Sequence, residues 1–501
     1  MSLEIHICIV QPGGYVHSLG FLDQARYYRY QLRRLGAEVS LAKNRLRHDA
    51  VNLIFGAHLG FDAELRTRYS CLFVNLEQLG EGGAVLRPDY LRLLKGSAVA
   101  DYDAENVAAY SAHPDEVPLL PLLFAPYLAQ QPAMPLEERP IDLLFIGTLN
   151  PRRSELLARI EAQGVQVTQF DAPTYGPERD QFIGQAKAVY NAHFYASSRF
   201  EQARVSHCLS LGTPVIAERG PATRPHVAFE DAVHWVDDAG LDRFFAERFG
   251  TPEFFAQSRA QLQRFRSSDP QASYADLLAF ANGYGRAHQQ RRPAEVWQPL
   301  RINLGSGKDY KSGWLNLDVV AHTQPDLLLD LGKPLTLPLR MHSDLAGEVL
   351  LEEGQCELFY ANNVLEHVPD LPMLMGNLLR LLQVGGAVEI EVPYEKALTA
   401  WQDPTHLRAM NENSWRYYTG WFWYLGWFEH RFESVEMVWL DEQLQPCAQP
   451  QAAFMRVLLR KVETTLRERT TARTMQADFG GLPEDWPIET SDAVFREDVA
   501  V

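Results

Sequence analysis

The segment from Arg301 to Asp318, RINLGSGKDYKSGWLNLD, constrains the fold more than any other part of the chain. An apolar stretch around Ile302 and Leu304 leads into a Gly-Ser-Gly turn, and a second apolar stretch ends on the acid Asp318. Glycines after a strand let the backbone approach a ligand closely, and an acid at the end of the next strand can accept hydrogen bonds from ribose hydroxyls. The segment therefore predicts a nucleoside-binding edge of a parallel sheet, beginning near residue 300.

The sequence after Asp318 predicts further alternating strands and helices. Asp330 closes a third apolar stretch, ELFYANNVLEHV predicts a strand running into a helix, and LLRLLQVGGAVEIEVP predicts a helix, a turn and a strand. Asp318 follows Gly307 by eleven residues, whereas nucleotide-binding units usually leave about 20. The short loop KDYKSGW is therefore expected to face the ligand in place of a helix N-terminus.

In this order the segments resemble the class I S-adenosylmethionine-dependent methyltransferases. The group with the closest likeness reads LNLGCG, GWxNVD, VLEH, LKPGG, VP and DPTH. Here Ser306 stands at the usual cysteine, and Gln383 and Val384 stand at the usual Lys-Pro. The resemblance implies a Rossmann-like domain over residues 300–462 that binds S-adenosylmethionine. The cofactor-binding residues that it implies are Asn303, Gly305, Ser306, Gly307, Asp318, Asp330, Asn363 and Glu366.

The resemblance also implies roles for individual residues. Asp318 is expected to accept hydrogen bonds from the ribose diol, and Asp330 from the adenine amino group. Methyl transfer from a sulfonium is an in-line displacement, and an oxygen acceptor usually needs its proton removed. His367 and His406 are both candidates for that base, with Asp403 as a neighbour, and a packing role remains open for His367. His367 and the acid before it have no evident third partner, so no metal is predicted.

Composition limits what the rest of the chain can do. With 501 residues the chain has room for about three domains, and its net charge of −17 disfavours nucleic acid and anionic membrane surfaces as partners. The five cysteines are scattered and form no Cys-x-x-Cys pair, which fits a reducing compartment. The N-terminus reads as a strand and not as a signal peptide, and no run of eighteen apolar residues occurs. A cytoplasmic protein without a transmembrane segment is predicted.

The first half of the chain also alternates strand and helix patterns, which is typical of open parallel sheets. Residues 1–128 are expected to form one Rossmann-like domain, and residues 140–285 a second one closed by helices at about 252–268 and 272–284. A proline-rich segment separates the two domains. Residues 286–299 read as a linker, and residues 463–501 as an acidic tail.

Two adjacent units of this kind resemble the GT-B glycosyltransferases, in particular those related to spore-maturation proteins. FIGTLNPRRSELL and NAHFYASSRFEQARVSHCLSLGTPVIAE carry the likeness to the donor side, with Leu209 where the usual pattern has a second glutamate. The resemblance implies nucleotide-sugar contacts by Gly147, Asn150, Arg152, Arg153, Glu201 and Arg204. The loop QPGGYVHSLG resembles the acceptor-side loop, which implies contacts by Gly13, Gly14 and His17. Arg152 and Arg153 at a helix start would suit a pyrophosphate; a solvated helix start is the alternative.

Residues 415–428, WRYYTGWFWYLGWF, hold nine aromatics in fourteen positions. Aromatic rings can form a platform for sugars, a docking surface for another domain or a membrane interface, and they also pack in cores. Most of the rings are expected to be structural, with two or three facing a ligand. Such a cluster also makes self-association plausible.

The sequence thus predicts an α/β protein with two GT-B domains followed by a class I methyltransferase domain. The function that this predicts is transfer of a sugar from a nucleotide sugar and of a methyl group from S-adenosylmethionine to a glycan hydroxyl, in surface polysaccharide or protein glycosylation. The acceptor would be a glycan or a glycosylated partner. Two alternatives stay open: a methyltransferase whose GT-B half binds glycan without catalysis, and a non-catalytic scaffold of a glycan-assembly complex. A protein or lipid acceptor for the methyl group also stays open.

Overall fold

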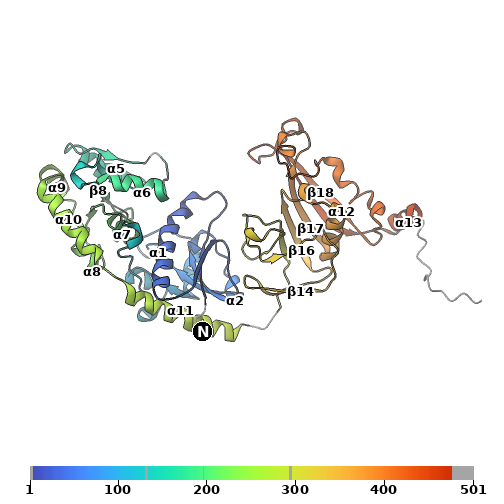
Figure 1. Cartoon of the computed structure of the whole chain (residues 1–501), viewed down its shortest axis with the longest axis horizontal. Coiled ribbons are helices and arrows are strands. Elements are labelled where there is room, and N and C mark those ends of the chain that lie inside the picture. Colours follow the sequence, from blue (N-terminus) through green and yellow to red (C-terminus); the bar gives the residue numbers. More distant parts are fainter. Residues whose placement is uncertain (1–3, 130–133, 171, 196, 293–295, 477–501) are drawn as a thin grey trace, which may run out of the picture. The chain divides into compact units, whose positions relative to one another are not determined.

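The computed structural model describes residues 4–129, 134–170, 172–195, 197–292 and 296–476. They fall in two compact units, residues 1–294 and residues 295–501. The first unit contains two parallel five-stranded sheets, and the second contains a mixed seven-stranded sheet (Figure 1). The α/β class expected from the sequence is confirmed. Within the described ranges, no helix combines the length and the apolar character needed to cross a bilayer.

The first sheet has the strand order β2-β1-β3-β4-β5, with every pairing parallel. This is the 2-1-3-4-5 order of flavodoxin-like folds. The central strand β3 is buried at all six residues, because strands of a parallel sheet are covered by helices on both faces. The elements are β1 (Glu4–Ile9), α1 (Gly20–Arg34), β2 (Val39–Lys43), β3 (Ala50–Phe55), α2 (Leu65–Arg68), β4 (Ser70–Val74), α3 (Pro88–Lys95), β5 (Ala98–Ala100) and α4 (Ala104–Val107).

The second sheet repeats the same order, β10-β9-β8-β6-β7, again with parallel pairings only. Its first helix, α5, begins with Pro151 after the cap Asn150, whose side chain accepts a hydrogen bond from the amide of Arg153, a strong N-terminal signal. The elements are β6 (Ile141–Phe145), α5 (Pro151–Glu161), β7 (Val167–Thr168), α6 (Gly176–Gln185), β8 (Ala186–Asn191), α7 (Gln202–Ser210), β9 (Val215–Glu218), α8 (Val227–Glu230), β10 (His234–Val236), α9 (Leu241–Glu247) and α10 (Pro252–Arg266).

The last helix of this unit, α11 (Gln271–Arg291), differs from its expected position. It does not close the second sheet, because Tyr274, Leu277 and Ala281 belong to the core of the first sheet. These three residues are spaced by three and four, so they form one apolar stripe of the helix. Tyr274 packs edge-on against Tyr28 of α1 at 5.1 Å between ring centroids. The helix also runs to Arg291, into the stretch expected to be a linker.

The seven-stranded sheet of the second unit has the order β13-β12-β11-β16-β17-β19-β18. The pairings are parallel from β13 to β17, and β19 and β18 add antiparallel pairings. The elements are β11 (Arg301–Leu304), β12 (Leu315–Asp318), β13 (Leu327–Leu328), the hairpin β14 (Leu339–Ser343) and β15 (Gly347–Leu351), β16 (Cys356–Asn362), α12 (Leu371–Leu381), β17 (Leu382–Pro393), β18 (His430–Leu440), β19 (Phe454–Glu463) and α13 (Leu466–Gln476).

The five parallel strands of this sheet follow the spatial order 3-2-1-4-5, and the direction in which successive strands are added to the sheet reverses between β11 and β16. A doubly wound sheet binds its ligand at this switch point, outside the carboxyl ends of the strands. The seven-stranded sheet therefore has a Rossmann-like strand order, and the bounds 300–462 of the domain stay a prediction. The helix α13 falls within the expected acidic tail, and residues 477–501 lie outside the described residues.

The aromatic segment 415–428 is divided between the core and the surface. Trp415, Tyr418 and Phe422 are buried, whereas Tyr417 and Tyr424 are exposed. Three of the nine rings thus support the fold from inside, and the exposed ones remain available for contacts.

Two buried histidines make the stability of the first unit depend on pH. Burial lowers the pKa of His6 and of His234 to about 4 each, and both rings bond to serine hydroxyls, those of Ser40 and Ser258. The unfolded chain binds protons at these groups below about pH 6.5 while the folded chain does not. Stability is therefore complete above pH 6.5 and falls as the pH drops toward 4. We expect a loss of about 2–3 kcal/mol per histidine over this window, measured as unfolding free energy against pH, with a shallower slope in His234→Phe.

Candidate functional site

The glycine turn after β11 lies at the switch point of the seven-stranded sheet. The amide of Gly307 donates to one carboxylate oxygen of Asp318 at 2.8 Å, and the amide of Val320 donates to the other at 2.9 Å. No helix separates β11 from β12, as expected from the short loop. Asp318 is thus fixed against the turn. Each carboxylate oxygen has two acceptor sites, so each oxygen retains one for a ligand.

Gly305 is required by the backbone as well as by its neighbours. Its φ of +58° lies in the left-handed region, and a Cβ atom placed on it would lie 2.5 Å from Cγ2 of Val364. Val364 follows β16, the strand on the other side of the switch point. The absence of a side chain at Gly305 therefore lets the two loops that flank the switch point pack together.

Ser306 carries an unsatisfied polar atom at this site. The residue is 3% exposed, and its buried hydroxyl has no hydrogen-bond partner among the residues that the structure describes. An unmet buried hydroxyl costs about 1–3 kcal/mol, so a polar ligand or water is the natural partner. Together with the free acceptor sites of Asp318, this fits the polar groups of a nucleoside cofactor.

The other expected cofactor residues take different positions. Asn303 is buried and donates to the carbonyl of Asp309 at 2.7 Å and to Asn316 at 3.0 Å, so it braces the loop from inside. Asp330 accepts from the amide of Gly332 at 2.9 Å and is partly exposed. Asn363 has a φ of +51°, and its side chain is exposed just beyond β16.

The structure brings His367 and His406 together at the carboxyl end of β16. Their rings lie 4.7 Å apart in an edge-to-face arrangement. Nδ1 of His406 bonds to the carbonyl of Ala400 at 2.9 Å, and Nδ1 of His367 lies 3.0 Å from the hydroxyl of Thr405. That hydroxyl donates to Asp403 at 2.6 Å. Asp403 therefore reaches His367 through Thr405, and both imidazoles keep Nε2 for other chemistry.

Glu366 completes this group. It is 1% exposed, and neither carboxylate oxygen has a hydrogen-bond partner among the described residues. Nε2 of His406 lies 3.9 Å from Oε1 of Glu366, which is beyond hydrogen-bond range. Burial raises the pKa of Glu366, against smaller opposing effects of its own backbone amide and of the two histidines. Glu366, which the sequence predicts as a cofactor contact, therefore lies next to His367 and His406, which the sequence predicts as candidate bases.

The first unit contains a separate cavity of about 860 Å³, lined by segments of both five-stranded sheets. Of the residues expected to hold a nucleotide sugar, Gly147, Arg153, Glu201 and Arg204 line it. On the side of the first sheet, His17 lines it, and Nδ1 of His17 lies 2.9 Å from the hydroxyl of Tyr175. Gly13 and Gly14 form an exposed turn ahead of His17 and do not belong to the lining.

The charged groups at the floor of this cavity are paired with one another. Arg153 is 1% exposed, and it donates to the carbonyls of Thr148 and Ala192 and to Glu201. The second oxygen of Glu201 pairs with Arg204 at 2.7 Å. Arg153 is therefore held by the protein. Of the two arginines, Arg204 is the more accessible, with a side chain that is 26% exposed.

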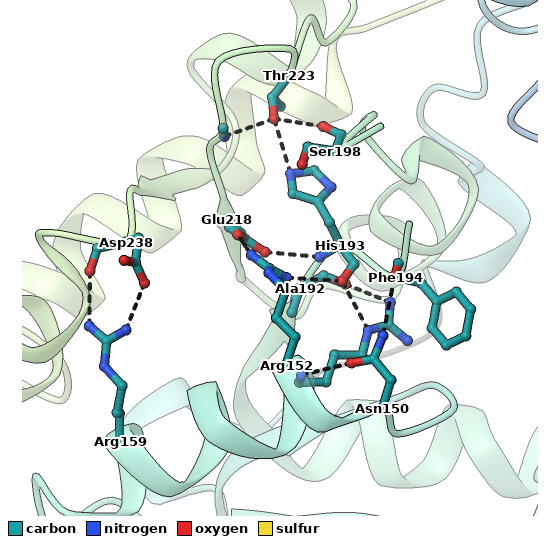
Figure 2. A network of polar contacts seen from close by, with 12 residues as sticks. Asn150, Arg152, Arg159, Ala192, His193, Phe194, Ser198, Glu218, Thr223 and Asp238 are labelled. Carbon is teal, nitrogen blue, oxygen red and sulfur yellow. Dashed lines mark hydrogen bonds and ion pairs between the residues drawn. The ribbon is translucent and has the colours of Figure 1, made fainter. Parts of the chain in front are cut away.

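Arg152 belongs to a different network. Figure 2 shows its guanidinium reaching from α5 to Glu218 at the end of β9 and to the carbonyl of His193. Glu218 also accepts from the amide of His193, and the ring of His193 bonds to Thr223 at 3.0 Å. Arg152 lies outside the lining of the cavity, as does Asn150, whose side chain donates to the carbonyl of Phe194 at 3.2 Å. This network fixes the loop after β8.

Several cavity residues were not identified from the sequence. Arg179 bonds to Asp23 at 2.7 Å and so joins the two sides of the cavity, and its guanidinium also meets His207 and Asp180. His207 could have been found, because it follows Glu201 and Arg204 at helical spacing on α7. Arg179 and Asp23 are 156 positions apart, and nothing in the sequence pairs them.

No family model matches the chain. A curated relative, "Uncharacterized protein L140" of Acanthamoeba polyphaga mimivirus, is 24% identical over 166 residues, which cover 31% of this chain and 50% of that protein. The chain thus spans about half the length of this relative.

Several solved structures with partial similarity are methyltransferases by description, and another is the [4+2]-cyclase SpnF. A S-adenosylmethionine-dependent methyltransferase from Archaeoglobus fulgidus is 13% identical, covers 35% of this chain and 92% of its own, and has a TM-score of 0.23. A second from Mesorhizobium loti is 16% identical, with coverage of 33% and 92% and a TM-score of 0.22. The 16S rRNA (adenine(1408)-N(1))-methyltransferase from Catenulisporales acidiphilia is 11% identical, with coverage of 34% and 89% and a TM-score of 0.23. The fold of the second unit follows from the strand order of its seven-stranded sheet.

Proposed function

We propose that residues 300–462 form a S-adenosylmethionine-dependent methyltransferase domain. The observation that carries the proposal is the glycine turn at the switch point, where the Gly307 amide is locked to Asp318 and the buried hydroxyl of Ser306 lacks a partner. This is the position at which a doubly wound sheet binds a nucleoside ligand. The sequence resemblance supplies the identity of that ligand.

The cofactor, when bound, supplies an electrophilic methyl group. The protein's own residues then have three tasks. Asp318 orients the nucleoside through its two remaining acceptor sites, the turn from Gly305 to Gly307 keeps the backbone close, and the group of Glu366, His367 and His406 lies beside the carboxyl end of β16 to activate the acceptor. Alignment of two reactants can supply about 7–11 kcal/mol of a reaction barrier.

The proposal predicts that the full-length chain binds S-adenosylhomocysteine with a one-to-one stoichiometry in calorimetry. Asp318→Ala removes both the nucleoside acceptor and the anchor of the Gly307 amide, so the affinity should fall by about 1–3 kcal/mol. Glu436→Ala, on an exposed part of β18, is the matched control and should bind as the wild type does. Unchanged affinity in Asp318→Ala would contradict this placement of the cofactor.

A second function, transfer of a sugar from a nucleotide donor, is favoured by the cavity in the first unit. Two sheets of identical strand order flank it, and it gathers Arg204, Glu201 and His17. A volume of about 860 Å³ falls within the range of ligand pockets. We propose that Arg204 contacts the donor phosphates, because it lines the cavity, which Arg152 does not, and its side chain is 26% exposed against 1% for Arg153. Titration with UDP, GDP and dTDP tests this: one nucleotide should bind, and Arg204→Ala should weaken it. If none of the three nucleotides binds, the result would favour a first unit that binds glycan without catalysing sugar transfer.

A glycan hydroxyl is the acceptor that unites both proposals, since tethered domains raise the effective concentration of one product at the other site. Labelled S-adenosylmethionine distinguishes the alternatives, because the label would appear in polysaccharide, in protein or in lipid. Binding of neither S-adenosylhomocysteine nor a nucleotide would leave the scaffold function standing.

A further inference from the structure

The strongest feature outside the cofactor turn is the group of Glu366, His367 and His406. Each of the three offers one ligand atom, and these atoms all lie within 4.8 Å of one another. Glu366 is almost fully buried, and neither of its carboxylate oxygens has a hydrogen-bond partner among the described residues. A buried carboxylate without a hydrogen bond is costly, so a positively charged partner would stabilise Glu366 at this position.

We infer that Glu366, His367 and His406 bind one divalent transition-metal ion. Two imidazole nitrogens and one carboxylate oxygen are a donor set suited to Zn²⁺ or Fe²⁺ and not to Mg²⁺ or Ca²⁺, which prefer oxygen ligands. Three protein ligands leave coordination positions open for an exogenous ligand.

The geometry fits such an ion. Two ligands bound at about 2.1 Å lie roughly 3.4 Å apart at a tetrahedral angle, and Nε2 of His406 lies 3.9 Å from Oε1 of Glu366. Small side-chain rotations close that difference. The ligand atoms of the group all lie within 4.8 Å of one another. To bind one ion, one imidazole must rotate toward the other two ligands.

The partners of the two imidazoles match those of metal-binding histidines. Such histidines usually direct the second ring nitrogen to a carbonyl, a hydroxyl or a carboxylate, which fixes the tautomer. Nδ1 of His406 bonds to the carbonyl of Ala400, and Nδ1 of His367 bonds to Thr405, which is anchored on Asp403. Both rings thereby present Nε2.

The backbone holds the two contributing segments together without help from an ion. The amide of Leu407 donates to the carbonyl of Glu366 at 2.8 Å. Arg408 donates to the carbonyls of Val368 and Pro369. The segment that carries His406 is therefore fixed against the turn that carries Glu366 and His367, so the site is largely preorganised.

The consequence for catalysis rests on the proposed methyl transfer, whereas the binding of the ion does not. A hydroxyl of the acceptor that occupies an open position would have its pKa lowered by the ion. The ion would then do what was expected of a histidine base, and His367 and His406 would serve as ligands. The acceptors that suit this arrangement are those with an oxygen able to coordinate a metal, such as a sugar hydroxyl.

Titration of the metal-free full-length chain with Co²⁺, followed by its visible absorption, tests the inference. One equivalent should bind, Zn²⁺ should displace it and Mg²⁺ should not. His406→Ala and Glu366→Gln should each weaken binding by at least about tenfold, the lower bound seen even for changes outside the ligand set. His113→Ala, an exposed histidine of the first unit, is the control and should leave binding unchanged.

The outcomes separate this inference from the proposed function. Far-UV circular dichroism verifies that each variant folds, and the two ligand variants serve as checks on one another. Absence of Co²⁺ binding, or equal binding by His406→Ala and the wild type, would overturn the inference. If S-adenosylhomocysteine still binds in that case, the methyltransferase proposal stands; if Co²⁺ binds and S-adenosylhomocysteine does not, only the metal site stands.

Discussion

Replacing Arg153 with alanine is expected to destabilise the second sheet by about 3–5 kcal/mol, the usual cost of breaking a buried ion pair from one side. The guanidinium is 1% exposed and donates to the carbonyls of Thr148, Ala192 and His193 as well as to Glu201. Its removal strands these acceptors in the interior. Hydrogen exchange of amides in β6 and α5 measures the local opening free energy.

Two further variants make this test specific. Arg259→Ala breaks an exposed pair with Glu137, and it should cost less than about 1 kcal/mol. Adding Glu201→Gln to Arg153→Ala should not recover the loss, because Glu201 keeps its ion pair with Arg204 and the stranded carbonyls carry the penalty. If Arg153→Ala costs no more than Arg259→Ala, the buried network does not support the fold as described.

Substituting alanine for Gly305 is expected to cost about 2–5 kcal/mol and to impair cofactor binding. The left-handed backbone accounts for about 1–2 kcal/mol. The new Cβ, 2.5 Å from Cγ2 of Val364, forces a stiff β-branched side chain to move, which adds about 1–3 kcal/mol. Hydrogen exchange of β11 and β12 amides measures the loss, and calorimetry with S-adenosylhomocysteine measures its effect on the site.

Gly354 supplies the matched control for Gly305. Its φ is +71°, and no atom lies within 4 Å of an added Cβ, so Gly354→Ala carries the backbone cost alone. Val364→Ala in the Gly305→Ala background should relieve the clash and restore part of the stability. Equal losses for the two glycine variants would show that close packing of the switch-point loops is not what requires Gly305.

The second unit could largely be predicted because its elements are local. The apolar stretches before Gly305 and Asp318 form β11 and β12, and Gly305 and Asp318 both lie at the carboxyl ends of these strands, as the sequence predicted. The approach of His406 to Glu366 could not be predicted, because the two residues are 40 positions apart and their contact depends on how two loops fold over the same strand end. That distance is also why a third metal ligand was not evident.

In the first unit the strands were predicted well and the tertiary contacts were not. Ala98–Ala100, for example, forms β5, and short apolar runs bounded by turns are the pattern that marks buried strands in a sequence. The docking of α11 on the first sheet and the pairing of Arg152 with Glu218 are interactions between distant segments. A basic pair at a helix start suggested phosphate binding, whereas one arginine became part of the core and the other an ion-pair partner.

Hydrogen exchange of the full-length chain with and without S-adenosylhomocysteine tests the central claim most directly. The account predicts slower exchange at the amides of Gly305, Ser306, Gly307 and Val320, which surround Asp318, and no change in β6 or α5 of the first unit. Protection confined to the first unit, or no protection anywhere, would contradict a cofactor site at the switch point of the seven-stranded sheet.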